Sequence, residues 1–186
     1  MSEHTAKADF ARDYLQDAIQ RFRRLETMVE RSLAQVDDDA FFAALTPEGN
    51  SIAILLKHIA GNMRSRWRDL LTTDGEKPDR HRDTEFEVKQ EDTRDAIMAR
   101  WEAGWQYLFE AMELLGPEDL RRTIYIRERP HLIVQAINRQ LAHYAYHVGQ
   151  IVFLAKHFQS GDWKWLSIAP GQSEQFNAEM RRTARS

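Results

Sequence analysis

The chain has 186 residues, 42% hydrophobic and 30% charged, which is enough for one globular domain with a substantial core and too little for two. Its formal net charge of -3 and its lack of a long basic run argue against nucleic-acid binding, because phosphate binding needs clustered lysine and arginine. The absence of cysteine excludes disulfides and thiolate ligands. The sequence has no secretion signal and no run near the roughly 20 apolar residues of a membrane span, which predicts a cytoplasmic protein with no membrane contact.

Residues 5–36 form the first predicted helix. Phe10, Tyr14, Ala18 and Phe22 recur at steps of four with charges between them, which is typical of an amphipathic helix with one buried face. This helix is expected to supply core and no chemistry. A short helical piece up to about residue 45 and a loop over residues 46–50 follow it.

The second predicted helix covers residues 52 to about 72, after a cap at Asn50 or Ser51. His58 lies at the border between its apolar arc and a polar row. A metal-ligating side chain at such a border can reach into the bundle while the metal site stays open to solvent. A histidine there can equally serve as a hydrogen-bond partner of a neighbouring segment.

Residues 73–90 are too polar for a core element and are predicted to form a flap over one end of the bundle. Phe86 is expected to tuck inward, and His81 to lie on the surface. The flap is expected to be held by ion pairs among Arg80, Arg82, Asp83 and Glu85.

A third helix is predicted from about residue 91 to Leu115, where Gly116 and Pro117 stop it. Trp101 and Trp105 on its inner stripe indicate core or a pocket wall. Alternating β-branched residues over 121–130 predict a brief extended segment before the last helix.

The fourth helix is predicted over residues 131–158 and carries His143 and His147 one turn apart on one side. Side chains at this spacing can hold a divalent ion without bending the helix, because their Cβ atoms are roughly 5–6 Å apart. Two such histidines are also common as core or surface groups, so a third ligand is needed. Beyond this helix, residues 162–177 are expected to be irregular, with Trp163, Trp165 and Phe176 packing on the bundle.

Four helices with apolar faces, long connections and a short extended segment predict an all-α four-helix bundle. The chain is interpreted as a single domain over residues 1–186, with frayed ends at about 1–5 and 177–186. In such a bundle His58 can meet His143 and His147. Three imidazoles with open positions for water indicate a catalytic metal site.

The sequence resembles the DinB/YfiT superfamily of metal-binding four-helix bundles over about residues 10–177. The resemblance starts from residues 143–151 (HYAYHVGQI) and from His58 in LLKHIAGN, and it is closest to a DinB-like subfamily described as a domain of unknown function. Further segments resemble that subfamily: NSIA at 50–53, GNMRSRW at 61–67, LTTDGEKP at 71–78, RDTEF at 82–86 and WLSIAPG at 165–171.

This resemblance implies that His58, His143 and His147 hold a divalent metal ion, with zinc or nickel the usual choice. Members of the superfamily include S-transferases that use a low-molecular-weight thiol, and others are described as hydrolases. Many form dimers, so the resemblance allows for a homodimer. Ala142, Ala145 and Gly149, turned away from the two histidines, predict a stripe where another helix packs, within the bundle or across a dimer.

Three functions remain open from the sequence. The first is a metal-dependent enzyme such as a thiol S-transferase acting on a small-molecule substrate. The second is a hydrolase using metal-bound hydroxide, which needs a general base. Asn62, Gln140 and Gln150 cannot take a proton, and Asp69 is roughly 16 Å along the helix from His58, which weakens this reading. The third is a non-enzymatic metal-binding or interaction bundle.

Overall fold

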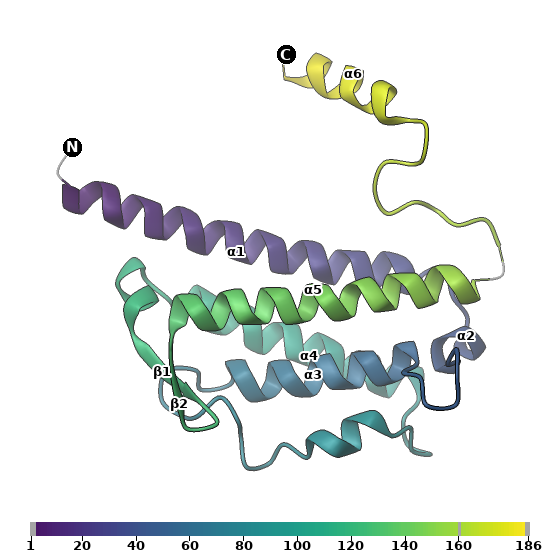
Figure 1. The fold of residues 1–186 in the computed structure, drawn as a ribbon, viewed down its shortest axis with the longest axis horizontal. Coiled ribbons are helices and arrows are strands. Elements are labelled where there is room, and N and C mark those ends of the chain that lie inside the picture. Colours follow the sequence, from purple (N-terminus) through teal and green to yellow (C-terminus); the bar gives the residue numbers. More distant parts are fainter. Residues whose placement is uncertain (1–2, 160, 185–186) are drawn as a thin grey trace.

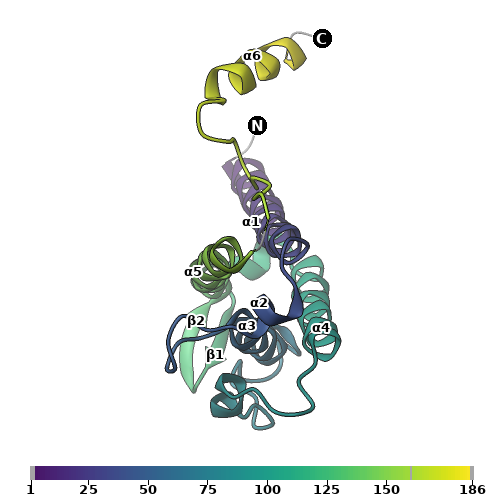
Figure 2. The ribbon, with the colours of Figure 1, turned by 90° about the vertical axis from the view of Figure 1, so that its right-hand side faces the viewer.

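The structure is a computed structural model that describes residues 3–159 and 161–184. Its four long helices are α1 (Glu3–Leu33), α3 (Ile52–Trp67), α4 (Arg94–Glu113) and α5 (Ile133–Phe158). Seen end on, they form a ring in which α1 packs on α5 and α4, and α3 packs on the same two helices (Figures 1 and 2). The predicted all-α bundle is confirmed.

The short elements are α2 (Asp38–Phe42), the 3-10 turns η1 (Arg82–Phe86) and η2 (Pro117–Arg121), the strands β1 (Thr123–Ile126) and β2 (Arg129–Leu132), and α6 (Ser173–Thr183). The strands pair antiparallel, so the predicted extended segment is a hairpin. Its turn residues Arg127 and Glu128 have left-handed φ angles of 54° and 61°. Asp74 accepts their two backbone N–H groups at 2.9 and 2.8 Å, which stabilises that turn.

Two helix boundaries differ from the prediction. Helix α5 begins at Ile133, two residues late, because Leu132 and His131 pair with β1. Helix α3 ends at Trp67, about five residues early, because Arg68 is extended and Asp69 has a φ of 51°. The predicted start of α3 is confirmed, since the Ser51 hydroxyl accepts the N–H of Ile54 at 3.2 Å.

The core is built around aromatic rings from all four long helices. Phe22 of α1 lies 5.8 to 6.3 Å, between ring centroids, from Trp67, Trp105 and Tyr144. The Trp67 indole donates to the Tyr144 hydroxyl at 3.1 Å, and that hydroxyl donates to the Asn62 carbonyl oxygen at 3.0 Å. This chain of hydrogen bonds fixes α3 against α5 beside the position of His143.

Residues 73–92 do not cap an end of the bundle. They run along the outer side of α3, on the side away from α1 (Figure 1). The backbone carbonyl of Gly75 accepts from Ser65 and Arg66, and Asp79 pairs with Arg64 and Arg68. The predicted flap position was wrong because α3 presents a row of polar side chains, and this polar segment satisfies them.

The C-terminal part leaves the bundle. Trp163 packs on the core as predicted, but Phe176 is 43% exposed and α6 has no buried residue. Helix α6 stands clear of the four long helices (Figures 1 and 2). The chain was expected to fray from about residue 177, but α6 covers residues 177–183 of that stretch. Residues 1–2 and 185–186, also expected to fray, lie outside the described part.

The small-residue stripe of α5 faces outward. Ala142, Ala145 and Gly149 are exposed, and a Cβ added at Gly149 would meet no atom within 4 Å. Packing of this stripe within the bundle was therefore wrong, and its role in a homodimer stays a prediction. Among the described helices, none has the length and apolarity that crossing a bilayer requires.

Candidate metal centre

Three imidazoles from two helices meet at one point between α3 and α5. The Nε2 atom of His143 lies 3.3 Å from Nε2 of His58 and 3.1 Å from Nε2 of His147. One ring nitrogen from each of the three lies within 4.8 Å of the others. Two nitrogens bound to one tetrahedral zinc at about 2.05 Å would be roughly 3.3 Å apart, so the spacing fits a shared ion.

The helices place these side chains for reasons visible in the sequence. His143 and His147 are one turn apart, so both project from the α3-facing side of α5. Tyr144, fully buried between them in the chain, anchors α5 through its bond to Asn62. His58 lies one turn before Asn62 on α3. The Tyr144–Asn62 bond therefore also fixes the position of His58 along the bundle axis relative to His143 and His147.

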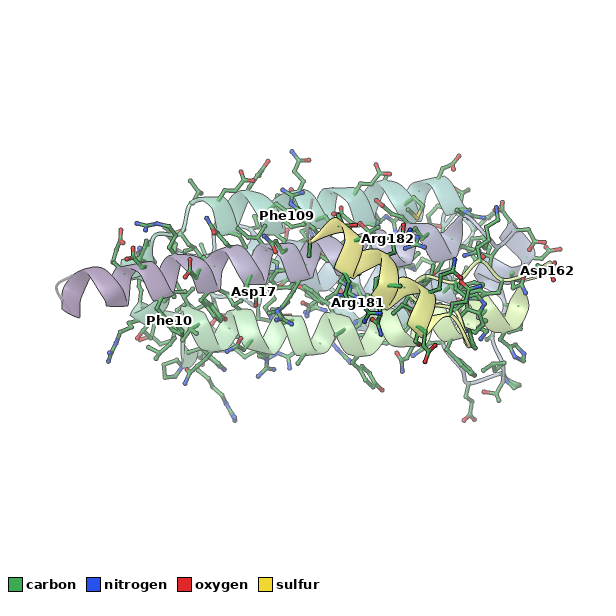
Figure 3. All side chains as sticks on the ribbon, turned by 90° about the horizontal axis from the view of Figure 1, so that it is seen from above. Phe10, Asp17, Phe109, Asp162, Arg181 and Arg182 are labelled. Carbon is green, nitrogen blue, oxygen red and sulfur yellow. The ribbon has the colours of Figure 1, made fainter. Side chains whose placement is uncertain are left out.

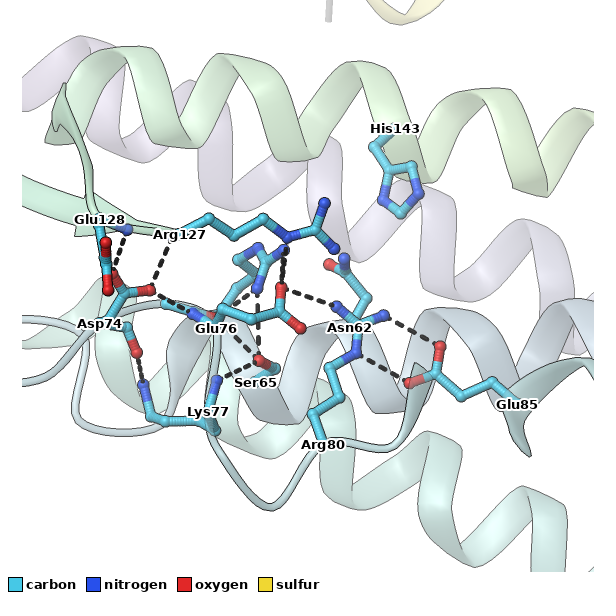
Figure 4. Close-up of polar contacts among 12 residues, drawn as sticks. Asn62, Ser65, Asp74, Glu76, Lys77, Arg80, Glu85, Arg127, Glu128 and His143 are labelled. Atoms are coloured by element: carbon cyan, nitrogen blue, oxygen red, sulfur yellow. Dashed lines mark hydrogen bonds and ion pairs between the residues drawn. The ribbon is translucent and has the colours of Figure 1, made fainter. Parts of the chain in front are cut away.

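Glu85 of η1 orients His58. Its Oε2 atom lies 2.9 Å from Nδ1 of His58, and its carboxylate accepts two hydrogen bonds from Arg80, each at 2.9 Å. Figure 4 shows the Arg80–Glu85 pair drawn over the α3 ribbon, with His143 projecting from α5 above. Burial alone would raise the pKa of Glu85, but the hydrogen bonds from His58 and Arg80 outweigh it and lower the pKa. Glu85 is therefore an ionised acceptor.

The outer hydrogen bonds decide which ring nitrogens carry protons. Because ionised Glu85 can only accept, Nδ1 of His58 carries a proton and donates a hydrogen bond to Glu85. His147 has the same arrangement, since its Nδ1 lies 2.9 Å from the carbonyl oxygen of Gln150. The Nε2 atoms of His58 and His147 therefore both face Nε2 of His143, where either a shared cation or an N–H of His143 can satisfy them. A histidine whose other nitrogen donates to a carboxylate is the usual setting of a metal ligand.

His143 is the least satisfied of the three. Its Nδ1 atom is buried without a hydrogen-bond partner among the described residues, and its Nε2 atom faces the Nε2 atoms of both other rings. Burial, then the nearby His147, His58, Arg80 and Arg66, lowers the pKa of His143 to about 3. Burial also lowers the pKa of His147. Both rings are neutral at physiological pH, which is the form that binds metal.

The three histidines are not equally accessible to solvent, since the α3 side of the cluster is buried and the α5 side is partly exposed. His58 is buried at 5% exposure, with the Phe86 ring 4.9 Å away, whereas His143 and His147 are partly exposed. Tyr146, largely exposed, lies 4.9 Å from the His147 ring. Three nitrogen ligands with one side open to solvent leave room for a substrate or water on a bound ion.

The other polar residues that the sequence singled out lie either beside the three histidines or away from them. Gln150 supports His147, and Asn62 supports Tyr144. Gln140 is buried, and its carbonyl oxygen has no partner in the described part of the chain. Asp69 and His81 are exposed and lie outside the centre, as the sequence indicated.

Sequence reasoning missed the role of Glu85. The predicted ion pair with Arg80 is confirmed, but its bond to His58 joins residues 27 positions apart through a polar segment. A helix period cannot reveal such a contact. One local signal existed: Gly61 follows His58 by three residues, and a Cβ there would lie 2.2 Å from Oε1 of Glu85.

Replacing Gly61 by alanine is expected to weaken metal binding about 10- to 100-fold, because the new methyl group pushes Glu85 away from His58. The measurement is competition for zinc against a chromophoric chelator. Gly149→Ala is the matched control, since its methyl group meets nothing and should leave the affinity unchanged. Wild-type affinity in Gly61→Ala would show that Glu85 does not support the centre.

Comparison with known proteins gives one family. The model of a family described as "Protein of unknown function (DUF1572)" matches residues 9–172, which include all three histidines and Glu85. No curated protein and no solved structure matches the chain.

Proposed function

We propose that this chain, which belongs to the DUF1572 family, binds a divalent metal ion, zinc or nickel, through His58, His143 and His147 and transfers a low-molecular-weight thiol to a small-molecule substrate. The observation that carries the proposal is the convergence of three Nε2 atoms, with that of His143 lying 3.3 Å from that of His58 and 3.1 Å from that of His147. The resemblance to DinB-like proteins supports the same ligand set.

A divalent ion held at this site supplies a Lewis acid that lowers the pKa of a bound thiol or water. The chain's own groups then decide between transfer and hydrolysis. Glu85 is occupied by His58 and Arg80 with a lowered pKa, so it is a poor general base. The amides of Gln150 and Asn62 cannot take a proton. A thiol has a much lower ordinary pKa than water and loses its proton outright on a metal ion, so it needs less help from a base, which favours transfer over hydrolysis.

The test is thiol consumption by the metal-loaded protein. A panel of low-molecular-weight thiols with a chloroarene electrophile should be consumed faster than by the same metal alone, and His143→Ala should remove the excess rate. An unchanged rate across the panel would contradict transfer. A hydrolysis product carrying labelled oxygen from the solvent would favour the hydrolase instead.

A further inference from the structure

A second cavity lies on the outer side of the bundle, away from the histidines. It has a volume of about 540 Å³ and is bounded by α1, α5 and residues 163–167. Figure 3 looks down on α1 and α5, which run side by side along this face. Its lining holds four cationic side chains, two indoles and no carboxylate: Arg23, Arg24, Arg31, Lys156, Trp163 and Trp165.

This cavity is separate from the metal centre. At 100° per residue, Val152 and Lys156 project about 140° and 180° around α5 from His147, so they face the opposite side of the helix. None of the three histidines lines it. Anything bound here would therefore not touch an ion held by the histidines.

The third wall, residues 163–167, is fixed in place. Arg31 donates to the backbone carbonyls of Trp165 and Leu166, both at 3.0 Å. Gln35 pairs with the backbone of Lys164 through two hydrogen bonds of 3.1 and 2.7 Å. Trp163 packs on the core. Residues 165–167 of this wall begin the WLSIAPG segment that the sequence singles out and that the metal centre does not use.

The positive charges of the cavity are weakly compensated. Lys156 lies 4.1 Å above the Trp165 ring, and Arg31 bonds only to neutral carbonyls. Arg23 interacts with two carboxylates, Glu113 at 3.9 Å with both side chains exposed and the nearby Glu26, and its guanidinium lies 4.3 Å over the Phe109 ring. Arg24 has no hydrogen bond or ion pair within the described part of the chain, so its guanidinium is available to a ligand.

We propose that this cavity binds a small organic anion that combines an aromatic ring with a phosphate group. Guanidinium and ammonium groups bind phosphate oxygens, and indole faces stack on flat rings. The volume falls within the roughly 300–1,000 Å³ that small-molecule sites occupy. The site is independent of the thiol-transfer proposal and is tested with or without metal.

The probe is 1-naphthyl phosphate, titrated into the full-length protein by isothermal calorimetry. We expect saturable binding of one probe per chain, and at least about tenfold weaker binding of 1-naphthol and of inorganic phosphate, because each lacks one half of the recognised chemistry. Arg24→Ala combined with Lys156→Ala should weaken naphthyl phosphate binding by at least about tenfold. Arg139→Ala, an exposed arginine on α5 outside the cavity, should leave it unchanged.

Several outcomes would overturn the proposal. These are the absence of saturable binding at millimolar probe, equal binding of 1-naphthol, equal binding of inorganic phosphate, or wild-type affinity in the double variant. Both substituted side chains are exposed, so the melting temperature should not change. If Lys156→Ala lowers it, Arg24→Ala alone carries the test. Metal loading should leave the affinity unaltered, which separates this result from that of the metal centre.

Discussion

Replacing His143 by alanine is expected to abolish the stabilisation that zinc or nickel gives this chain. His143 is the imidazole whose Nε2 atom approaches both of the others, at 3.3 and 3.1 Å, so its loss leaves two separated ligands. At a metal concentration 100 times the dissociation constant, the wild type should gain about 2.7 kcal/mol, or about 5–10 °C in melting temperature. Thermal denaturation with and without metal measures the difference.

The control for this variant is His81→Ala, which removes an exposed histidine outside the centre and should respond to metal as the wild type does. Without metal, His143→Ala loses the Nε2 contacts to His58 and His147 but no bond at Nδ1, so any loss of stability is measured on the metal-free protein and kept apart from the response to metal. An equal rise in melting temperature on adding metal to His143→Ala would contradict the three-histidine site.

The second large effect is expected at the buried ion pair between Lys57 and Asp92. Its atoms are 2.5 Å apart, and the two side chains are 6% and 2% exposed. Asp92→Asn leaves the Lys57 ammonium buried with only neutral partners, among them the carbonyl of Glu87. Leaving one charge of a buried pair uncompensated costs about 3–5 kcal/mol. Urea denaturation should show a loss of that size in the free energy of unfolding.

Lys57→Met is the matched variant and should cost less, because it removes the buried cation while Asp92 keeps its bonds to Arg100 at 2.8 Å and to the N–H of Lys89 at 2.9 Å. Equal losses in the two variants would contradict this asymmetry. The Lys57–Asp92 pair ties the end of the segment that carries Glu85 to α3. Asp92→Asn should therefore also weaken metal binding, by a smaller factor than Gly61→Ala.

The same carboxylate predicts a pH dependence. Burial alone would raise the pKa of Asp92, but hydrogen bonds from Lys57, Lys89 and Arg100 outweigh it and lower the pKa below the ordinary 3.8. A lowered folded-state pKa adds stability that is present above pH 3.8 and is lost as the pH falls towards the folded value. Acidification below about pH 4 should therefore destabilise the wild type more than Asp92→Asn.

The sequence predicts that three histidines meet because two of them follow a helix period and the third lies at the edge of an apolar arc, and the structure brings these three together. Each of these signals depends only on spacing within its own helix, so the packing of the helices does not change it. The support from Glu85 could not be predicted in this way, since it depends on the path of residues 73–92 along α3. That path is set by long-range contacts such as those of Gly75 and Asp79.

Element boundaries failed where tertiary contacts override local pattern. The apolar arc of α3 continues to Leu70, yet the helix ends at Trp67 because Asp69 turns the chain through a left-handed φ. At the other end of the molecule, Phe176 was expected to pack on the bundle, but it belongs to α6, which has no buried residue. Amphipathic spacing alone does not say whether a helix finds a partner within its own chain.

The most direct test of the metal centre is anomalous diffraction from crystals of the protein soaked in zinc and recorded at the zinc absorption edge. The account predicts one strong peak between α3 and α5, about 2.0–2.1 Å from the Nε2 atoms of His58, His143 and His147. A peak elsewhere, or none at saturating zinc, would contradict it.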